Sequence, residues 1–95
     1  MKDLFLENAK VLDHYTLEEQ AIVWIEEMSE LTKEITKRLR NKEFTDESLA
    51  HFKEELTDVQ ICLDQMRVAI DYNFDEQEDN YRKKVERTKE RIKNE

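Results

Sequence analysis

Acidic residues recur at a spacing of three in two separate stretches of the sequence. Glu27 and Glu30 form one pair, and Glu55 and Asp58 form the other. Side chains three residues apart leave a helix within about 60° of each other, so each pair would present two carboxylates on one helical face. Carboxylate oxygens are ligands that Mg²⁺ prefers, and four of them on two helices could hold one or two ions.

The second pair borders residues that are expected to be buried. Glu55 lies beside the main apolar stripe of its segment, and Asp58 lies about 60° further round, in an arc shared with Cys62 and Ala69. Carboxylates in this setting repel one another and are costly to desolvate unless a cation compensates their charge. The alternative is ordinary solvated helix surface, which is common in a chain of which 42% is charged. Two pairs with equal spacing favour the metal site.

Helices must position these carboxylates, because the 95 residues include no glycine, no proline and many strong helix formers. Apolar residues recur at helical period over roughly residues 17–40 and 46–72, which predicts two long helices packed as an antiparallel hairpin. A short helix over roughly residues 2–13 precedes them, and a narrow-striped helix capped at Asp75 ends the chain. We therefore predict one all-α domain over residues 1–95, built as a four-helix bundle.

The size of the chain indicates an oligomer. A domain of this length has a modest core, and the apolar stripe of the third helix, widened by Cys62 and Ala69, exceeds what one neighbouring helix would cover. A homodimer or homotetramer that completes the bundle is expected. The single cysteine excludes an internal disulfide. No apolar run approaches the roughly 18 residues of a membrane span, and residues 1–10 lack a signal-peptide pattern, so we expect a cytoplasmic protein without a membrane partner.

Charge is unevenly distributed along the chain. The net charge of −8 disfavours a nucleic-acid binder. Residues 82–95 hold seven Lys/Arg and three Asp/Glu, a net charge of +4, and subtracting them from 16 basic and 24 acidic residues leaves −12 for residues 1–81. An acidic body thus ends in a basic helix. Such a tail is often only solvated, helix-stabilising surface.

The two acidic motifs, taken in order, resemble a known family. EEMSE followed by EELTD resembles the E-E-x-x-E and E-x-x-D pattern of MazG-like nucleoside triphosphate pyrophosphohydrolases, the all-α NTP pyrophosphatase superfamily. The resemblance covers about residues 15–92, and the basic stretch KKVERTKERI is similar to a C-terminal helix of short phage-type and bacterial members. It implies hydrolysis of a (d)NTP to a nucleoside monophosphate and pyrophosphate, with Mg²⁺ as cofactor and Mn²⁺ as a substitute.

By motif position, the resemblance implies that Glu27, Glu30, Glu55 and Asp58 are the metal ligands. Glu26, the first glutamate of the pattern, would hold a second metal or orient the attacking water. The side chain of Glu26 leaves the helix about 100° from that of Glu27, which places it at the edge of such a site.

The basic tail gains a role under the same resemblance. Lys84, Arg87 and Arg91 share an arc of about 60° beside the apolar stripe of the last helix, so they could face the β- and γ-phosphates of the substrate. The alternative is a surface row paired with Glu86 or Glu90.

Two other interpretations remain. One is a non-catalytic acidic helical protein that binds a basic partner, and the other is a phosphoribosyl-ATP pyrophosphohydrolase, whose family also carries paired acidic motifs. Mg²⁺-dependent release of pyrophosphate would distinguish either enzyme from the non-catalytic binding protein. No site role is assigned to His51, which lacks ligand spacing, or to Cys62, which is expected to be a small core residue.

Overall fold

The architecture is built from helices alone. The computed structural model describes residues 1–42 and 44–95, and these contain no strand. The chain runs through α1 (Lys2–Ala9), the short 3-10 helix η1 (Lys10–Asp13), α2 (Leu17–Asn41), α3 (Asp46–Ala69) and α4 (Phe74–Lys93). The prediction of an all-α protein with four helices is confirmed, although the first predicted helix divides into α1 and η1.

Local capping contacts determine where the long helices begin. The Thr16 hydroxyl accepts from the Glu19 amide at 3.1 Å, and the Glu19 carboxylate accepts from the Thr16 amide at 3.0 Å, which forms the capping box of α2. Thr45 and Ser48 form the same reciprocal pair at the start of α3. At the other end of α2, Lys42 adopts a left-handed conformation with φ 56° and stops the helix after Asn41.

The predicted cap of α4 is wrong by two residues. The Asn73 side chain, not that of Asp75, accepts from the Glu76 amide at 2.9 Å, and the helix begins at Phe74. Asn73 has the extended backbone of a cap residue, whereas Asp75 already lies in the first turn, where its charge favours the helix dipole.

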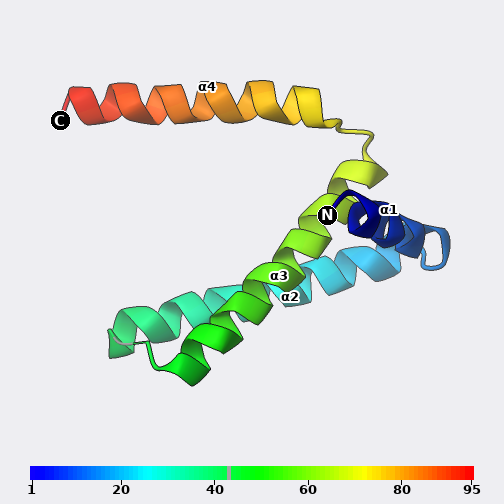
Figure 1. The fold of residues 1–95 in the computed structure, drawn as a ribbon, viewed down its shortest axis with the longest axis horizontal. Coiled ribbons are helices and arrows are strands. Elements are labelled where there is room, and N and C mark those ends of the chain that lie inside the picture. The colour runs from blue at the N-terminus through cyan, green and yellow to red at the C-terminus, as the bar shows by residue number, and fades with distance from the viewer. Residues whose placement is uncertain (43) are drawn as a thin grey trace.

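The hairpin of α2 and α3 forms the body of the molecule, and α1 packs on α3 (Figure 1). Polar side chains share the interior with apolar ones. The buried residues among those described are Trp24, Val59 and Cys62, together with Gln20, Glu34, Gln65 and Arg67. The expectation that Cys62 is a core residue is confirmed. No described helix is both long and apolar enough to cross a membrane.

Gln65 organises this polar interior. Its Oε1 accepts from Gln20 Nε2 and from Trp24 Nε1, each at 2.8 Å, and its Nε2 donates to Asn8 Oδ1 at 2.8 Å. Asn8 Nδ2 in turn donates to the Ile61 carbonyl at 3.0 Å. One buried side chain of α3 therefore joins α1 to α2, and every polar atom of its amide group has a partner.

Helix α4 is attached to this body at its first residue. The Arg67 guanidinium lies 3.7 Å from the centre of the Phe74 ring, and the Phe5 ring packs against Phe74 at 5.2 Å. Beyond that anchor, α4 runs away from the hairpin (Figure 1), and every residue from Glu78 to the end of the chain is exposed. Within one chain, α4 thus does not close a bundle with α2 and α3.

Candidate metal centre

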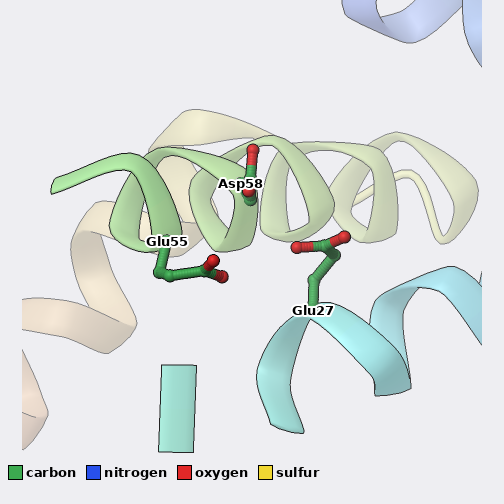
Figure 2. A group of neighbouring side chains, drawn as sticks. All are labelled: Glu27, Glu55 and Asp58. Carbon is green, nitrogen blue, oxygen red and sulfur yellow. The ribbon is translucent and has the colours of Figure 1, made fainter. Parts of the chain in front are cut away.

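Three of the predicted carboxylate ligands converge between α2 and α3. One carboxylate oxygen each from Glu27, Glu55 and Asp58 lies within 4.8 Å of the others. Figure 2 shows Glu27 reaching from α2 toward Glu55 and Asp58, which leave successive turns of α3. The spacing of three aligns the two residues of α3, and the hairpin brings Glu27 opposite them.

The cluster is electrostatically unfavourable without a cation. The pKa of Glu27 is raised above its ordinary value, first by desolvation and then by the charges of Asp58, Glu55 and Glu30, with a hydrogen bond to Asp58 adding to the shift. The pKa of Cys62 is raised by burial and then by the charges of Glu27 and Asp58. Its thiol therefore stays protonated beside the carboxylates, which leaves an oxygen donor set that suits a hard divalent ion.

Glu55 gives a separate indication that the cluster fits a cation. Its side chain is only 12% exposed. Its Oε2 atom is buried and has no hydrogen-bond partner among the described residues. A buried carboxylate oxygen without a partner is costly, and a bound divalent cation is one way to satisfy it.

The other two predicted glutamates lie outside this group. Glu30 is exposed and its carboxylate lies 3.2 Å from Lys33 Nζ, although its charge still acts on Glu27. Glu26 is exposed on the flank of α2. Both positions follow from helix geometry, since each residue is rotated toward solvent relative to Glu27. The role of Glu30 as a metal ligand and the role of Glu26 as a catalytic residue remain predictions.

The predicted phosphate-binding residues are distant from the carboxylates of their own chain. Lys84, Arg87 and Arg91 are exposed on α4, which runs away from the α2–α3 hairpin (Figure 1). A single chain does not bring the basic and acidic parts of the predicted site together.

Glu34 and His51 extend the acidic site along the hairpin, and sequence reasoning missed both. Glu34 is 3% exposed, and its carboxylate lies 3.5 Å from Lys37 Nζ and 3.8 Å from the guanidinium of Arg38. His51 Nε2 lies 3.1 Å from Glu34 Oε1 and 3.9 Å from Glu55 Oε1. His51 therefore sits between a charge-compensated buried carboxylate and the predicted ligand Glu55.

A heptad spacing could have revealed this extension. Glu34 follows Glu27 by seven residues, and His51 precedes Asp58 by seven, so each shares a helical face with a member of the cluster. Glu34 shares the helical arc of Glu27 and Glu30 in the sequence, but neither Glu34 nor His51 was predicted to have a role in the site.

The pKa of Glu27 leads to a prediction on stability. A carboxyl group whose pKa is raised on folding binds its proton more tightly in the folded state. Its contribution to stability is therefore greatest below the ordinary value of 4.5 and is lost as pH rises through the raised pKa. Glu27→Gln should reduce this fall in stability, which urea titrations in a metal chelator from about pH 4 to about pH 7 would measure.

The matched control is Glu18→Gln on the same helix, because Glu18 is exposed, lies outside the cluster and forms no ion pair with a described residue. That variant should keep the pH dependence of the wild type. Identical pH profiles for Glu27→Gln and the wild type would contradict the electrostatic strain assigned to the cluster.

The chain matches no protein-family model, no curated protein and no solved structure. The function proposed below therefore depends on the geometry of the carboxylates and on the resemblance of their two motifs.

Proposed function

We propose that the protein is a Mg²⁺-dependent, MazG-like nucleoside triphosphate pyrophosphohydrolase that converts a (d)NTP to a (d)NMP and pyrophosphate. The observation that carries the proposal is the approach of Glu27, from the EEMSE motif, to Glu55 and Asp58, from the EELTD motif. The fold brings carboxylate oxygens of residues about thirty positions apart in sequence to within 4.8 Å of one another, and the unpartnered Glu55 Oε2 adds to the case for a cation.

Each acidic residue has a proposed task. Glu27, Glu55 and Asp58 hold the cation, and Glu30 joins them by turning from Lys33, to which it is bound by an exposed ion pair worth at most about 1 kcal/mol. Glu26, at the edge of the site, orients the water molecule. Bound Mg²⁺, or Mn²⁺ in its place, would neutralise phosphate charge and polarise that water.

The reaction needs no protein nucleophile. The water oxygen forms a bond to the α-phosphorus and gives up a proton to solvent, while the bond from that phosphorus to the α–β bridging oxygen breaks, so pyrophosphate leaves with the bridging oxygen. Catalysis then depends on positioning and on charge stabilisation. The protonated Cys62 thiol beside the cluster takes no part in the bond changes.

An oligomer belongs to the proposal. Apolar residues of α3 at heptad spacing remain between 39% and 47% exposed in a single chain, and these are Leu49, Leu56 and Leu63. A homodimer or homotetramer would cover them and complete the helical bundle. The enzyme is proposed to act in the cytoplasm on free nucleotides.

The test is product analysis on a panel of canonical and damaged (d)NTPs. With Mg²⁺ present, at least one should give pyrophosphate and nucleoside monophosphate in equal amounts, and a chelator should stop the reaction. Release of orthophosphate instead would contradict cleavage between the α- and β-phosphates. No hydrolysis of any nucleotide would favour the alternative, an acidic helical protein that binds a basic partner.

A further inference from the structure

Six of the seven basic residues of α4 fall into two rows on opposite sides of its apolar stripe, and the seventh, Lys83, lies on the face opposite the stripe. The residues of the first row are ion-paired within the helix: Arg82 with Glu78 at 2.9 Å, Lys89 with Glu86 at 3.3 Å and Lys93 with Glu90 at 4.0 Å. The second row consists of Lys84, Arg87 and Arg91, and none of these forms an ion pair with any described residue. The charges of the second row are therefore not neutralised by the carboxylates of α4.

The apolar stripe between the two rows is largely exposed to solvent. Tyr81, Val85 and Ile92 are 68%, 43% and 63% exposed. A helix of 20 residues is about 30 Å long, and such helices gain most of their stability by packing an apolar face. Helix α4 is therefore built to lie against another surface.

The connection from α3 directs α4 away from its own body. Asp71 takes a left-handed conformation with φ 56°, and the Tyr72 amide donates to the Arg67 carbonyl at 2.8 Å, as in a Schellman motif. The Asn73 cap follows at once, and Phe74 is held between Arg67 and Phe5. With this exit angle set by several contacts, the basic row of α4 does not reach the carboxylates of its own hairpin (Figure 1).

A second copy of the chain has the complementary surface. Residues 1–81 carry a net charge of −12 against +4 on residues 82–95. The α2–α3 hairpin offers the three clustered carboxylates together with exposed apolar side chains such as Val23, Leu56 and Leu63. Acidic and apolar groups on the hairpin match basic and apolar groups on α4. If two copies exchange α4 about a two-fold axis, the hairpin and the α4 of each copy are both matched with complementary groups.

We propose that α4 of each chain docks on the α2–α3 hairpin of a second copy, where Lys84, Arg87 and Arg91 complete the partner's phosphate-binding site. This inference rests on the proposed pyrophosphohydrolase function for the role of the basic row. The exchange of helices itself is independent of any activity. Each site then takes its metal ligands from one chain and its phosphate ligands from the other.

The first experiment measures association without using activity. In one variant Lys84, Arg87 and Arg91 all become Glu, and in the matched control Arg82, Lys89 and Lys93 all become Glu. Light scattering should give the 11.6 kDa monomer for the first variant and about twice that mass for the control and the wild type. The control breaks the ion pairs of α4, so loss of helix stability would affect it more. A monomeric wild type, or equal behaviour of the two variants, would overturn the exchange.

The second experiment locates the basic row relative to the carboxylates. Asp58→Asn and Arg87→Ala chains are each assayed alone, and Arg87→Ala should lose roughly ten- to a hundredfold of the triphosphatase rate. The two are then unfolded and refolded together at equal amounts. Half of the random dimers are mixed, and exchange leaves one intact site in each, so about a quarter of the wild-type activity should return.

The outcomes separate the two proposals. An active wild type whose mixed variants regain nothing overturns the contribution of α4 to the partner's site but leaves the enzyme assignment standing. A wild type that forms dimers through the basic row of α4 but releases no pyrophosphate overturns the function and leaves the exchange standing.

Discussion

Replacing Asp58 with asparagine is expected to lower pyrophosphate release by more than about a hundredfold and to abolish measurable Mg²⁺ binding. Asp58 supplies one of the three oxygen donors that lie within 4.8 Å of one another, and an amide is a neutral and weaker ligand for Mg²⁺. Steady-state kinetics and calorimetric titration with Mg²⁺ would measure the two losses. The helical circular dichroism should persist.

The same substitution should leave the metal-free protein equally stable or slightly more stable. Asp58 is one of the charges that raise the pKa of Glu27, so its removal relieves repulsion within the cluster. A large loss of stability would instead show a structural role for this carboxylate. This opposite effect on function and stability distinguishes a metal ligand from a packing residue.

Glu54→Gln is the matched control for Asp58→Asn. Glu54→Gln removes the same charge from α3, but the Glu54 side chain is 76% exposed, lies outside the cluster and contacts His51 Nδ1 at 3.8 Å. Its turnover and Mg²⁺ affinity should equal those of the wild type. Normal turnover in Asp58→Asn would disprove the metal assignment.

Gln65→Ala is expected to cost about 3 kcal/mol of unfolding free energy, the largest stability effect foreseen for this chain. The substitution strands two buried donors, Gln20 Nε2 and Trp24 Nε1, that share its carbonyl oxygen, and it also ends the contact with Asn8. The total unfolding free energy of a protein domain is roughly 5–15 kcal/mol, so the substitution would remove a large part of the stability.

Urea denaturation followed by tryptophan fluorescence would measure this loss, because Trp24 is the only tryptophan and its indole N–H is part of the network. Gln65→Met, which keeps most of the volume, should cost a similar amount if the stranded donors are the cause. Gln60→Ala serves as control, since Gln60 is exposed and its side-chain amide donates to Asp64 Oδ1, one turn along the same helix, at 3.1 Å. A Gln65→Ala variant as stable as that control would contradict the assigned role of the network.

Local interactions allowed much of the helical framework to be predicted from sequence. The capping box of Thr16 and Glu19 involves residues three apart, and the apolar period of α2 and α3 involves neighbours on one helix. Such contacts are the same in any tertiary context, so their residue types are sufficient to indicate them. The same is true of the direction in which Glu55 and Asp58 leave α3.

Tertiary packing decided which carboxylates meet. Glu27 and Glu30 have the same spacing as Glu55 and Asp58, yet Glu30 faces solvent and Lys33 while Glu27 enters the cluster. The rotation of α2 against α3 makes this choice, and it depends on how whole side chains interlock across the hairpin. Spacing within one helix carries no information about that rotation.

The sequence likewise did not predict which polar residues are buried. Glu34 and Gln65 have polar side chains of kinds that usually lie on the surface. Both can be buried because residues of other helices satisfy them: His51 contacts Glu34, and Trp24 and Asn8 bond to Gln65. The direction of α4 depends in the same way on the packing of Arg67 and Phe5 around Phe74. Helices and their faces follow from contacts between residues a turn apart, whereas the neighbours of those faces arise only when distant segments pack together.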